Sequence, residues 1–341
     1  MSTETQLLKV RSLRTAVKID GTDHLIVGGV DLDLHAGETM ALVGESGSGK
    51  SVTALSIARL LGPNIRTIAG QVVFEGRDLL TLSERDMRAL RGREISVVFQ
   101  EPMTSLNPVL TVYTQLAEII RRRPAAGVDI RARAIELLDS VGISIPEARA
   151  DMYPHQLSGG MRQRVMLAIA IAARPRVLIA DEPTTALDVT TQAQILDLLR
   201  FHTCDMHAAM LLITHDMGVV ARYADSVNVM YAGGIVERAP VRELFARPAH
   251  PYTRGLLKSI ARIDRPRLPR LPAIEGLPPP LTARPSGCPF EPRCAYSIAR
   301  CSDMPPLAPV APGHDAACWR AKELLEEMNV GAEAAATGAA R

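Results

Sequence analysis

Cysteine is nearly absent from most of this chain. The sequence of 341 residues holds 5 cysteines, and Cys204 is the only one before residue 288. The other four lie close together in a Pro-rich C-terminal stretch; they are Cys288, Cys294, Cys301 and Cys318. So uneven a distribution excludes a disulfide framework for the main body. In a reducing compartment it favours a metal or redox site near the C-terminus.

Long hydrophobic runs and an excess of one charge are also lacking. The longest clean apolar run, "VMLAIAIAA" at 165–173, is far shorter than the roughly 18 residues of a membrane-spanning helix. The start, "MSTETQLLKVRSL", has no basic stretch followed by an apolar run, so no secretory signal is indicated. The net charge of +2 offers no electrostatic basis for broad binding to nucleic acid or membrane surfaces. We therefore expect a cytoplasmic globular protein.

The first 245 residues or so alternate short apolar runs with longer segments of helical period. The runs are rich in Leu and β-branched residues, and a polar or Gly-rich turn follows each; they are "TMALV" (39–43), "ISVVF" (95–99), "RVLIA" (176–180) and "AMLLIT" (209–214). This pattern is typical of parallel strands buried on both faces, with functional loops at their carboxyl ends. Segments 78–93 and 131–142 are predicted as amphipathic helices outside the sheet. The sequence thus predicts an α/β fold.

The composition changes after about residue 263. Segment 265–285 is dense in proline, which sustains neither a helix nor an inner strand, so an extended connector is predicted. The cysteine cluster follows, and then a short predicted helix at 319–328. The Ala- and Gly-rich end, from about residue 326, is expected to be disordered. Cys204 falls in a helical segment and is predicted to be a small packed side chain.

The stretch "GESGSGKS" matches the phosphate-binding pattern G-x-x-x-x-G-K-[ST] in full. It follows the run 39–43 and opens a predicted helix, which is the context the motif requires. Its glycines let backbone N–H groups face phosphate oxygens at the positive end of a helix, and its lysine supplies a point charge to the β- and γ-phosphates. The predicted phosphate-binding residues are Gly44, Glu45, Ser46, Gly47, Ser48, Gly49, Lys50, Ser51 and Val52.

A second motif, "RVLIADEP", places two carboxylates directly after a buried strand. Asp181 is placed to bind Mg²⁺ through its waters, together with the Ser51 hydroxyl. Glu182 is the candidate general base for the attacking water. Two neighbouring carboxylates are otherwise ordinary surface charge, and the complete phosphate loop is what favours the functional interpretation.

A third motif, "LSGGMRQR" at 157–164, offers a second anion-binding helix terminus. Ser158 carries a hydroxyl, and Gly159 and Gly160 expose N–H groups at the start of a predicted helix. Together with the two preceding motifs, the sequence closely resembles the ATP-binding subunits of ABC transporters, whose pattern is "LSGGQ"; Met161 replaces Gln here. The resemblance implies a P-loop NTPase with a helical subdomain, in which two subunits sandwich two ATP molecules and each signature serves the partner's ATP.

The resemblance covers about residues 7–245 and assigns further residues. It implies that Gln100 senses the γ-phosphate side, that Asp188 belongs to a loop at the dimer interface, and that His215 holds the attacking water. The family usually stacks an aromatic ring on adenine, yet residues 9–43 contain no Phe, Tyr or Trp. Val17 is placed at the aromatic position, and His24 is the only ring in this region.

Several stretches resemble one branch of the family, the oligopeptide/dipeptide (and nickel) importers: "FQEPMTSLNPV", "GGMRQRVMLA", "HPYTRGLLKSI" and the "GCPFEPRC" tail. The branch implies ATP-driven uptake of short peptides by two related ATPases beneath two permeases, fed by an external binding protein, at the cytoplasmic face of the membrane. We expect the ATPase domain at 1–260, with its helical subdomain at about 101–170. The connector and cysteine region follow at 261–325, and a disordered tail at 326–341.

The four cysteines of the tail have a spacing of C-x5-C-x6-C-x16-C. Structural zinc knuckles normally use two to four intervening residues, which this arrangement lacks. Four thiolates are also the ligands of a [4Fe–4S] cluster, and the importer branch is associated with one in this region. We predict the cluster on Cys288, Cys294, Cys301 and Cys318, with zinc or reduced structural thiols as the alternatives.

Two other functions compete with the importer interpretation. A soluble ABC ATPase acting on nucleic acid or ribosomes usually carries two ATPase units or a long coiled-coil insertion, and neither is present. A metal-binding module with a vestigial ATPase is disfavoured because Lys50, Asp181, Glu182 and His215 are all in place. A nickel importer of the same branch stays open.

Overall fold

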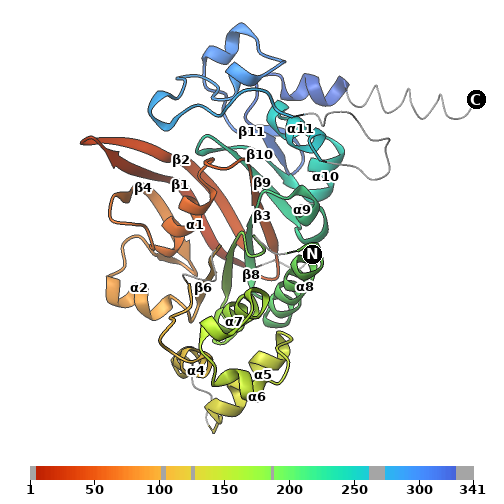
Figure 1. The fold of residues 1–341 in the computed structure, drawn as a ribbon. Helices are drawn as coiled ribbons and strands as arrows, with labels where there is room; N and C mark the ends of the chain where they lie inside the picture. The colour runs from red at the N-terminus through yellow and green to blue at the C-terminus, as the bar shows by residue number, and fades with distance from the viewer. Residues whose placement is uncertain (1–4, 101–104, 124–126, 186–187, 261–272, 328–341) are drawn as a thin grey trace, which may run out of the picture.

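The computed structural model describes residues 5–100, 105–123, 127–185, 188–260 and 273–327. Two sheets form the centre, with helices packed around them and the C-terminal region at one end (Figure 1). The predicted α/β class is confirmed. The first part of the predicted connector and the end of the chain (261–272 and 328–341) lie outside the described residues.

The larger sheet has eight strands in the order β11-β12-β10-β9-β3-β8-β7-β6. The five strands from β9 to β6 run parallel, and β10, β12 and β11 add antiparallel neighbours at one edge. The four predicted strands are all present, each within one residue of its expected end. The bounds are β3 (Thr39–Val43), β6 (Ile95–Val98), β7 (Val177–Asp181), β8 (Ala209–Thr214), β9 (Ser226–Tyr231), β10 (Gly234–Pro240), β11 (Ala308–Ala311) and β12 (His314–Ala316).

The smaller sheet is antiparallel and has the order β2-β1-β4-β5. Its strands are β1 (Gln6–Ile19), β2 (Thr22–His35), β4 (Ile65–Phe74) and β5 (Arg77–Asp78). Alternate side chains such as Leu8 and Leu32 are fully buried, and they share one apolar core with Ile57 of α1 (Lys50–Ala58) and Leu42 of β3. These strands alternate between buried and more exposed side chains because only one face of the smaller sheet packs on the core. The strands β3, β7 and β8 are covered on both faces and are buried at every position.

The remaining helices surround the sheets. They are α2 (Glu84–Leu90), α4 (Val112–Arg122), α5 (Ile130–Ser140), α6 (Pro146–Ala150), α7 (Gly159–Ile171), α8 (Val189–Met206), α9 (Met217–Tyr223), α10 (Val241–Ala246) and α11 (Pro251–Lys258). Of these, α4, α5, α6 and α7 form the lower part of the molecule in Figure 1, and α10 and α11 lie in its upper part. Short 3-10 turns occupy Pro154–Gln156, Leu281–Ala283, Glu291–Arg293 and Ala299–Ser302. In the part of the chain that the structure describes, no helix is both long and apolar enough to cross a membrane.

Two predicted helices differ from the structure in extent or environment. The helix predicted over 78–93 is shorter, because Ser83 caps α2 by accepting a hydrogen bond from the Asp86 N–H, and Asp78 lies in β5. The packed position predicted for Cys204 is wrong: it lies on α8 and is exposed. The buried side chains of α8 are Ile195, Leu196, Leu199 and Thr203, so Cys204 falls outside the apolar stripe.

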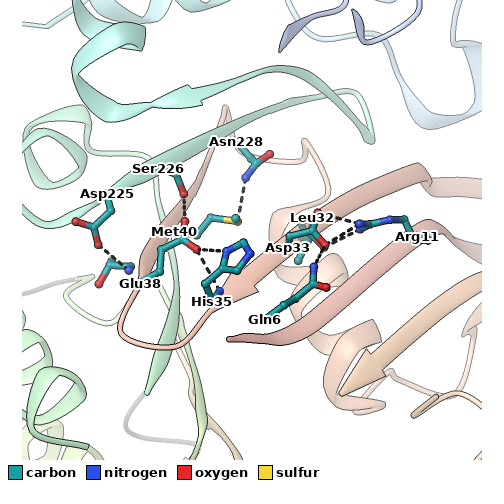
Figure 2. Close-up of polar contacts among 11 residues, drawn as sticks. Gln6, Arg11, Leu32, Asp33, His35, Glu38, Met40, Asp225, Ser226 and Asn228 are labelled. Atoms are coloured by element: carbon teal, nitrogen blue, oxygen red, sulfur yellow. Dashed lines mark hydrogen bonds and ion pairs between the residues drawn. The ribbon is translucent and has the colours of Figure 1, made fainter. Parts of the chain in front are cut away.

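Polar contacts position the start of β3, the strand that leads to the phosphate loop (Figure 2). The Glu38 carboxylate meets His35 Nδ1 at 2.9 Å and accepts a hydrogen bond from the Ser226 hydroxyl of β9. The Thr39 N–H donates to the Asp225 carboxylate at 2.9 Å. These contacts join β2, β3 and β9 at one end, so the loop at the other end of β3 begins from a fixed position.

Candidate functional site

The phosphate loop lies between β3 and α1 and depends on its glycines. Gly44, Gly47 and Gly49 have φ values of 152°, 78° and 107°, which other residues rarely adopt. A Cβ on Gly44 would lie 2.1 Å from the Met230 carbonyl oxygen, so no side chain fits there. Ser48 is 4% exposed, and its hydroxyl has no partner. A tight backbone cradle with an unpartnered buried hydroxyl fits an anionic oxygen ligand.

Charged groups from two strand ends meet at this loop. The Lys50 ammonium donates to the carbonyl oxygens of Gly44 and Glu45 at 2.8 and 3.0 Å. The Ser51 hydroxyl donates to the Asp181 carboxylate at 3.0 Å. Burial lowers the pKa of Lys50 and raises that of Asp181, so both charges are costly in the protein alone. Ser51 and Asp181 form the paired oxygen donors that Mg²⁺ prefers.

Glu182 is the centre of the catalytic group that the sequence predicts. Its carboxylate accepts hydrogen bonds from Gln100 Nε2 at 3.3 Å and from the Thr185 hydroxyl at 3.0 Å, and it meets His215 Nδ1 at 3.2 Å. Its side chain is only 17% exposed, whereas that of His215 is 66% exposed. The structure thus brings Gln100, Glu182 and His215 together from the ends of β6, β7 and β8. No sequence pattern indicated the hydrogen bond from Thr185 to Glu182.

The signature turn lies elsewhere on the molecule. Ser158 caps α7, its hydroxyl accepting from the Met161 N–H at 3.3 Å, and Gly159 and Gly160 begin the helix. Figure 1 shows α7 among the helices of the lower part, apart from α1 and the phosphate loop. Gln163 of α7 donates to the Pro183 carbonyl beside Glu182, a link that sequence reasoning missed. Within one chain the two anion-binding termini do not form a single site.

Asp188 has a local role that the sequence did not predict. It caps α8, its carboxylate accepting from the N–H groups of Thr190 and Thr191 and from the Thr191 hydroxyl at 2.7 Å. These hydrogen bonds lower the pKa of Asp188, although the carboxylate is exposed to solvent. The two residues before it, 186–187, lie outside the described residues.

The residues considered for adenine lie across from each other in the smaller sheet. Val17 of β1 pairs with His24 of β2, and both are half-buried. The structure therefore brings the apolar side chain and the single ring to one place. What either would contact in a bound nucleotide stays a prediction.

The four C-terminal cysteines are at least partly buried in the C-terminal region. Burial raises the pKa of Cys288, Cys294 and Cys318, that of Cys318 to about 11, and the neighbouring cysteines add to the effect. Cys288 and Cys301 belong to one apolar cluster against which Cys294 packs, and the Cys288 N–H donates to the Cys301 carbonyl at 2.9 Å. Among the residues that the structure describes, no three or more His, Cys, Asp or Glu side chains are arranged to hold a metal ion. The geometry of the described residues thus lends no support to the predicted [4Fe–4S] cluster or to the zinc alternative.

Two residues at the phosphate loop were missed by sequence reasoning. Arg293, in the cysteine region, forms an ion pair with Glu45 at 2.7 Å. The Tyr252 hydroxyl accepts a hydrogen bond from the Glu45 N–H at 2.7 Å. Both lie more than 200 residues from Glu45 in the sequence, so no local pattern could indicate the contact.

Two family models match the chain. One, described as ABC transporter, matches residues 27–185. The other, described as the C-terminal region of oligopeptide/dipeptide transporters, matches residues 236–301. Together they include the phosphate loop, the signature and three of the four clustered cysteines.

Curated relatives match over nearly their whole length. A probable peptide ABC transporter ATP-binding protein of Sinorhizobium fredii is 50% identical, over 94% of this chain and 96% of that protein. The oligopeptide transport ATP-binding proteins OppD of Salmonella typhimurium and Bacillus subtilis are 45% and 46% identical, over 94% and 92% of this chain and 95% and 89% of theirs.

Solved structures share the fold. The dimeric ATP-binding cassette MJ0796, bound to ADP and Pi in a post-hydrolysis state, aligns with a TM-score of 0.62 and 27% identity. The alignment covers 69% of this chain and 99% of that one. CbiO1 of Clostridium perfringens, described as part of the ABC transporter complex cbiONQ, gives a TM-score of 0.60 with 27% identity, over 71% of this chain and 92% of that one.

Proposed function

Because the chain belongs to the ATP-binding proteins of the ABC transporter family, we propose that it powers the import of oligopeptides or dipeptides. It binds and hydrolyses ATP and closes as a dimer with a second ATPase subunit. The observation that carries the proposal is that similarity to peptide-transport ATPases extends over 94% of the chain, joined to a complete phosphate-loop motif.

The site residues have distinct roles in this proposal. Lys50 and the N–H groups of the phosphate loop bind the β- and γ-phosphates, a role supported by the cradle at Gly44. Ser51 and Asp181 would hold Mg²⁺, which neutralises charge on the phosphates. Gln100 then lies on the γ-phosphate side, next to the catalytic group.

Glu182 acts as the general base. It takes a proton from a water whose oxygen attacks the γ-phosphorus, the bond to the bridging oxygen breaks, and ADP leaves. His215 holds that water in line, a role supported by its contact with Glu182. The signature residues Ser158 and Gly160 contact the ATP of the partner subunit, and Asp188 lies near that interface. The separation of α7 from α1 supports this arrangement (Figure 1).

The proposed partners are those of the oligopeptide/dipeptide importers. We propose two membrane-spanning permeases above the ATPase pair and, indirectly, an extracytoplasmic peptide-binding protein. The chain then lies at the cytoplasmic face of the membrane as a peripheral subunit. The match to the oligopeptide/dipeptide C-terminal region supports this assembly over a soluble ATPase that acts on nucleic acid or ribosomes.

Reconstitution tests the function. The chain, its second ATPase, the two permeases and the binding protein are placed in liposomes, and ATP hydrolysis is measured with added peptides of two to five residues. We expect peptide to stimulate hydrolysis and to accumulate inside the liposomes. Stimulation by nickel instead of peptide, or stimulation of the free chain by RNA or ribosomes, would contradict the proposal.

We also propose that the four clustered cysteines hold a [4Fe–4S] cluster with a structural role. The support is the residue type alone, since four thiolates are the ligand set of such a cluster. The described side chains are not themselves arranged around a metal ion. Metal binding would require their deprotonation, against the raised pKa values of the free thiols. A bound cluster would tie together a region that is too small for a core of its own.

Anaerobic purification tests the metal assignment. A brown protein with about four iron and four sulfide per chain is expected, and Cys301→Ser should lose the colour. A protein with one zinc ion per chain and no visible absorption would contradict the cluster and support the zinc alternative. Metal-free protein with four titratable thiols would show that the cysteines are structural.

A further inference from the structure

The C-terminal segment reaches back to the phosphate loop. Arg293, one residue before Cys294, forms two hydrogen bonds with the Glu45 carboxylate, Nη1 to Oε2 at 2.7 Å and Nη2 to Oε1 at 3.0 Å. The Arg293 side chain is 4% exposed and that of Glu45 is 28% exposed, so the pair is largely removed from water. Paired, charge-assisted hydrogen bonds of this kind are about twice as strong as neutral ones and fix the geometry of both groups.

Arg293 is held rigidly by its surroundings. Its guanidinium also donates to the Tyr231 hydroxyl at 3.2 Å and to the Glu275 carbonyl at 2.9 Å. The same group lies 5.8 Å from the centre of the Tyr231 ring and 5.9 Å from that of Phe290. Phe290 packs edge-on against Tyr231 with a ring distance of 5.3 Å. The loop between Cys288 and Cys294 thus presents both Phe290 and Arg293 to the ATPase body.

Glu45 is therefore fixed at its backbone and at its side chain. Its N–H donates to the Tyr252 hydroxyl at 2.7 Å, and its carboxylate meets Arg293. Glu45 is also electrostatically coupled to Lys50: burial lowers the pKa of Lys50, and the charge of Glu45 opposes that shift together with Glu182 and Asp181. A carboxylate so near the lysine would repel the phosphates of ATP unless another cation offsets it.

We propose that Arg293 is a positioning residue for ATP binding, acting through Glu45. It neutralises the one carboxylate of the phosphate loop and holds that loop in the conformation in which its N–H groups face the phosphates. This role rests on the ATP site described above. It makes the C-terminal region part of the nucleotide-binding machinery, with an effect on affinity instead of on the chemical step.

The test is a double-mutant cycle on the full chain. Equilibrium binding of a fluorescent ATP analogue with Mg²⁺ is measured for Arg293→Gln, Glu45→Gln and the double variant, with thermal unfolding recorded for each. Loss of a charge-assisted bidentate contact should weaken ATP binding about tenfold in Arg293→Gln. The double variant should bind ATP as tightly as Glu45→Gln and more tightly than Arg293→Gln, because it leaves no uncompensated carboxylate in the phosphate loop.

Controls separate this role from general stability. Arg320→Gln breaks another Arg–Glu pair of the C-terminal region, with Glu323 at 2.6 Å, and should leave ATP affinity unchanged. Arg293→Lys keeps the positive charge but cannot form two parallel hydrogen bonds with the Glu45 carboxylate. Its ATP affinity should therefore fall between those of the wild type and Arg293→Gln. In the assembled transporter Arg293→Gln should raise KM with kcat within about twofold.

Three outcomes would overturn the role of Arg293. They are wild-type affinity in Arg293→Gln, a double variant as weak as Arg293→Gln at an unchanged melting temperature, and equal affinity in Arg293→Lys and Arg293→Gln. Lys50→Ala, tested beside them, should abolish binding. If Lys50→Ala has no effect either, the ATP site itself is misplaced, and the failure does not concern Arg293.

Discussion

Glu182 combines three structural features. It is a carboxylate directly after a fully buried strand, it accepts from Gln100 and Thr185, and its φ of 44° lies in the left-handed region. A non-glycine residue in that region costs about 1–3 kcal/mol. The surroundings compensate, since the Glu182 N–H bonds to the Ile213 carbonyl of the next strand at 3.0 Å. Strain held in place in this way is typical of a residue whose direction matters.

Glu182→Gln should therefore separate binding from turnover. The amide keeps the size and hydrogen-bonding capacity of the side chain but cannot take a proton, so hydrolysis should fall about 100-fold or more while ATP binding is kept. Steady-state hydrolysis and equilibrium ATP binding measure the two effects.

Glu94→Gln is the matched control, because Glu94 precedes the same β6 strand whose other end leads to Gln100. It should hydrolyse ATP at the wild-type rate. Residual hydrolysis near the wild-type level in Glu182→Gln would assign the base to another group.

At the scale of elements, the C-terminal region is docked by a buried polar cluster. Glu237 of β10 is 0% exposed and accepts from the N–H groups of Ala249 and His250 at 2.6 and 2.9 Å. His314 of β12 meets the same carboxylate at 2.7 Å. His250 Nδ1 in turn accepts from the Tyr252 N–H, which caps α11. One carboxylate thus joins β10, α11 and β12, the elements that lead to Arg293 and the cysteines.

This cluster should make stability sensitive to acid. Burial lowers the pKa of His250 from 6.5 to about 4, so between these values the unfolded chain binds a proton that the folded chain does not. Stability then falls as the pH drops from about 6.5 towards 4 and is independent of this group above 6.5. At pH 5 the loss from His250 should be about 2 kcal/mol.

His250→Asn removes the titrating group and keeps an acceptor for the cap. Urea unfolding at pH 5 and pH 7.5 should show a smaller loss in the variant than in the wild type, by about the same 2 kcal/mol. An unchanged pH dependence would mean that His250 does not stay neutral in the folded chain.

For the whole molecule, the separation of the phosphate loop from the signature is the decisive feature. Ser158 and Gly160 begin α7, whereas Lys50 begins α1 in another part of the molecule (Figure 1). Each terminus is built to meet an anion, and only a second subunit can bring a signature to this chain's phosphate loop. The dimeric cassette structure with a similar fold supports that arrangement.

Gly160→Asp should disrupt the dimer and leave the monomer's own site intact. A Cβ at Gly160 meets only Thr191 Cγ2 at 3.8 Å, and a carboxylate at a helix start does not harm the helix, so folding is kept. The added charge should repel the partner's γ-phosphate. In the Glu182→Gln background, size-exclusion chromatography with light scattering should show an ATP-dependent dimer with the second ATPase, which Gly160→Asp abolishes.

ATP affinity of the isolated Gly160→Asp chain is the internal control. It should equal that of the chain with Gly160. A loss as large as that in Lys50→Ala would place the signature in the chain's own ATP site instead of the partner's.

The sequence by itself determined the chemistry of the nucleotide site and the class of the fold. Both follow from short stretches of sequence. Residues 44–51 lead from a buried strand through a Gly-rich turn into a helix, and Asp181 and Glu182 directly follow another buried strand. Backbone conformation and strand burial are local properties, so the sequence pattern is sufficient to predict them. The exposed position of Cys204 was not predicted, because it depends on which face of α8 packs on the sheet.

Only the tertiary structure decided how distant segments meet. The pairing of Arg293 with Glu45, the docking of His314 on Glu237 and the link from Gln163 to Pro183 join residues that no periodicity relates. Such contacts arise where separate elements pack, and their geometry depends on every element between them. The cysteine region was recognised from its residues, but its position against the phosphate loop came from the fold alone.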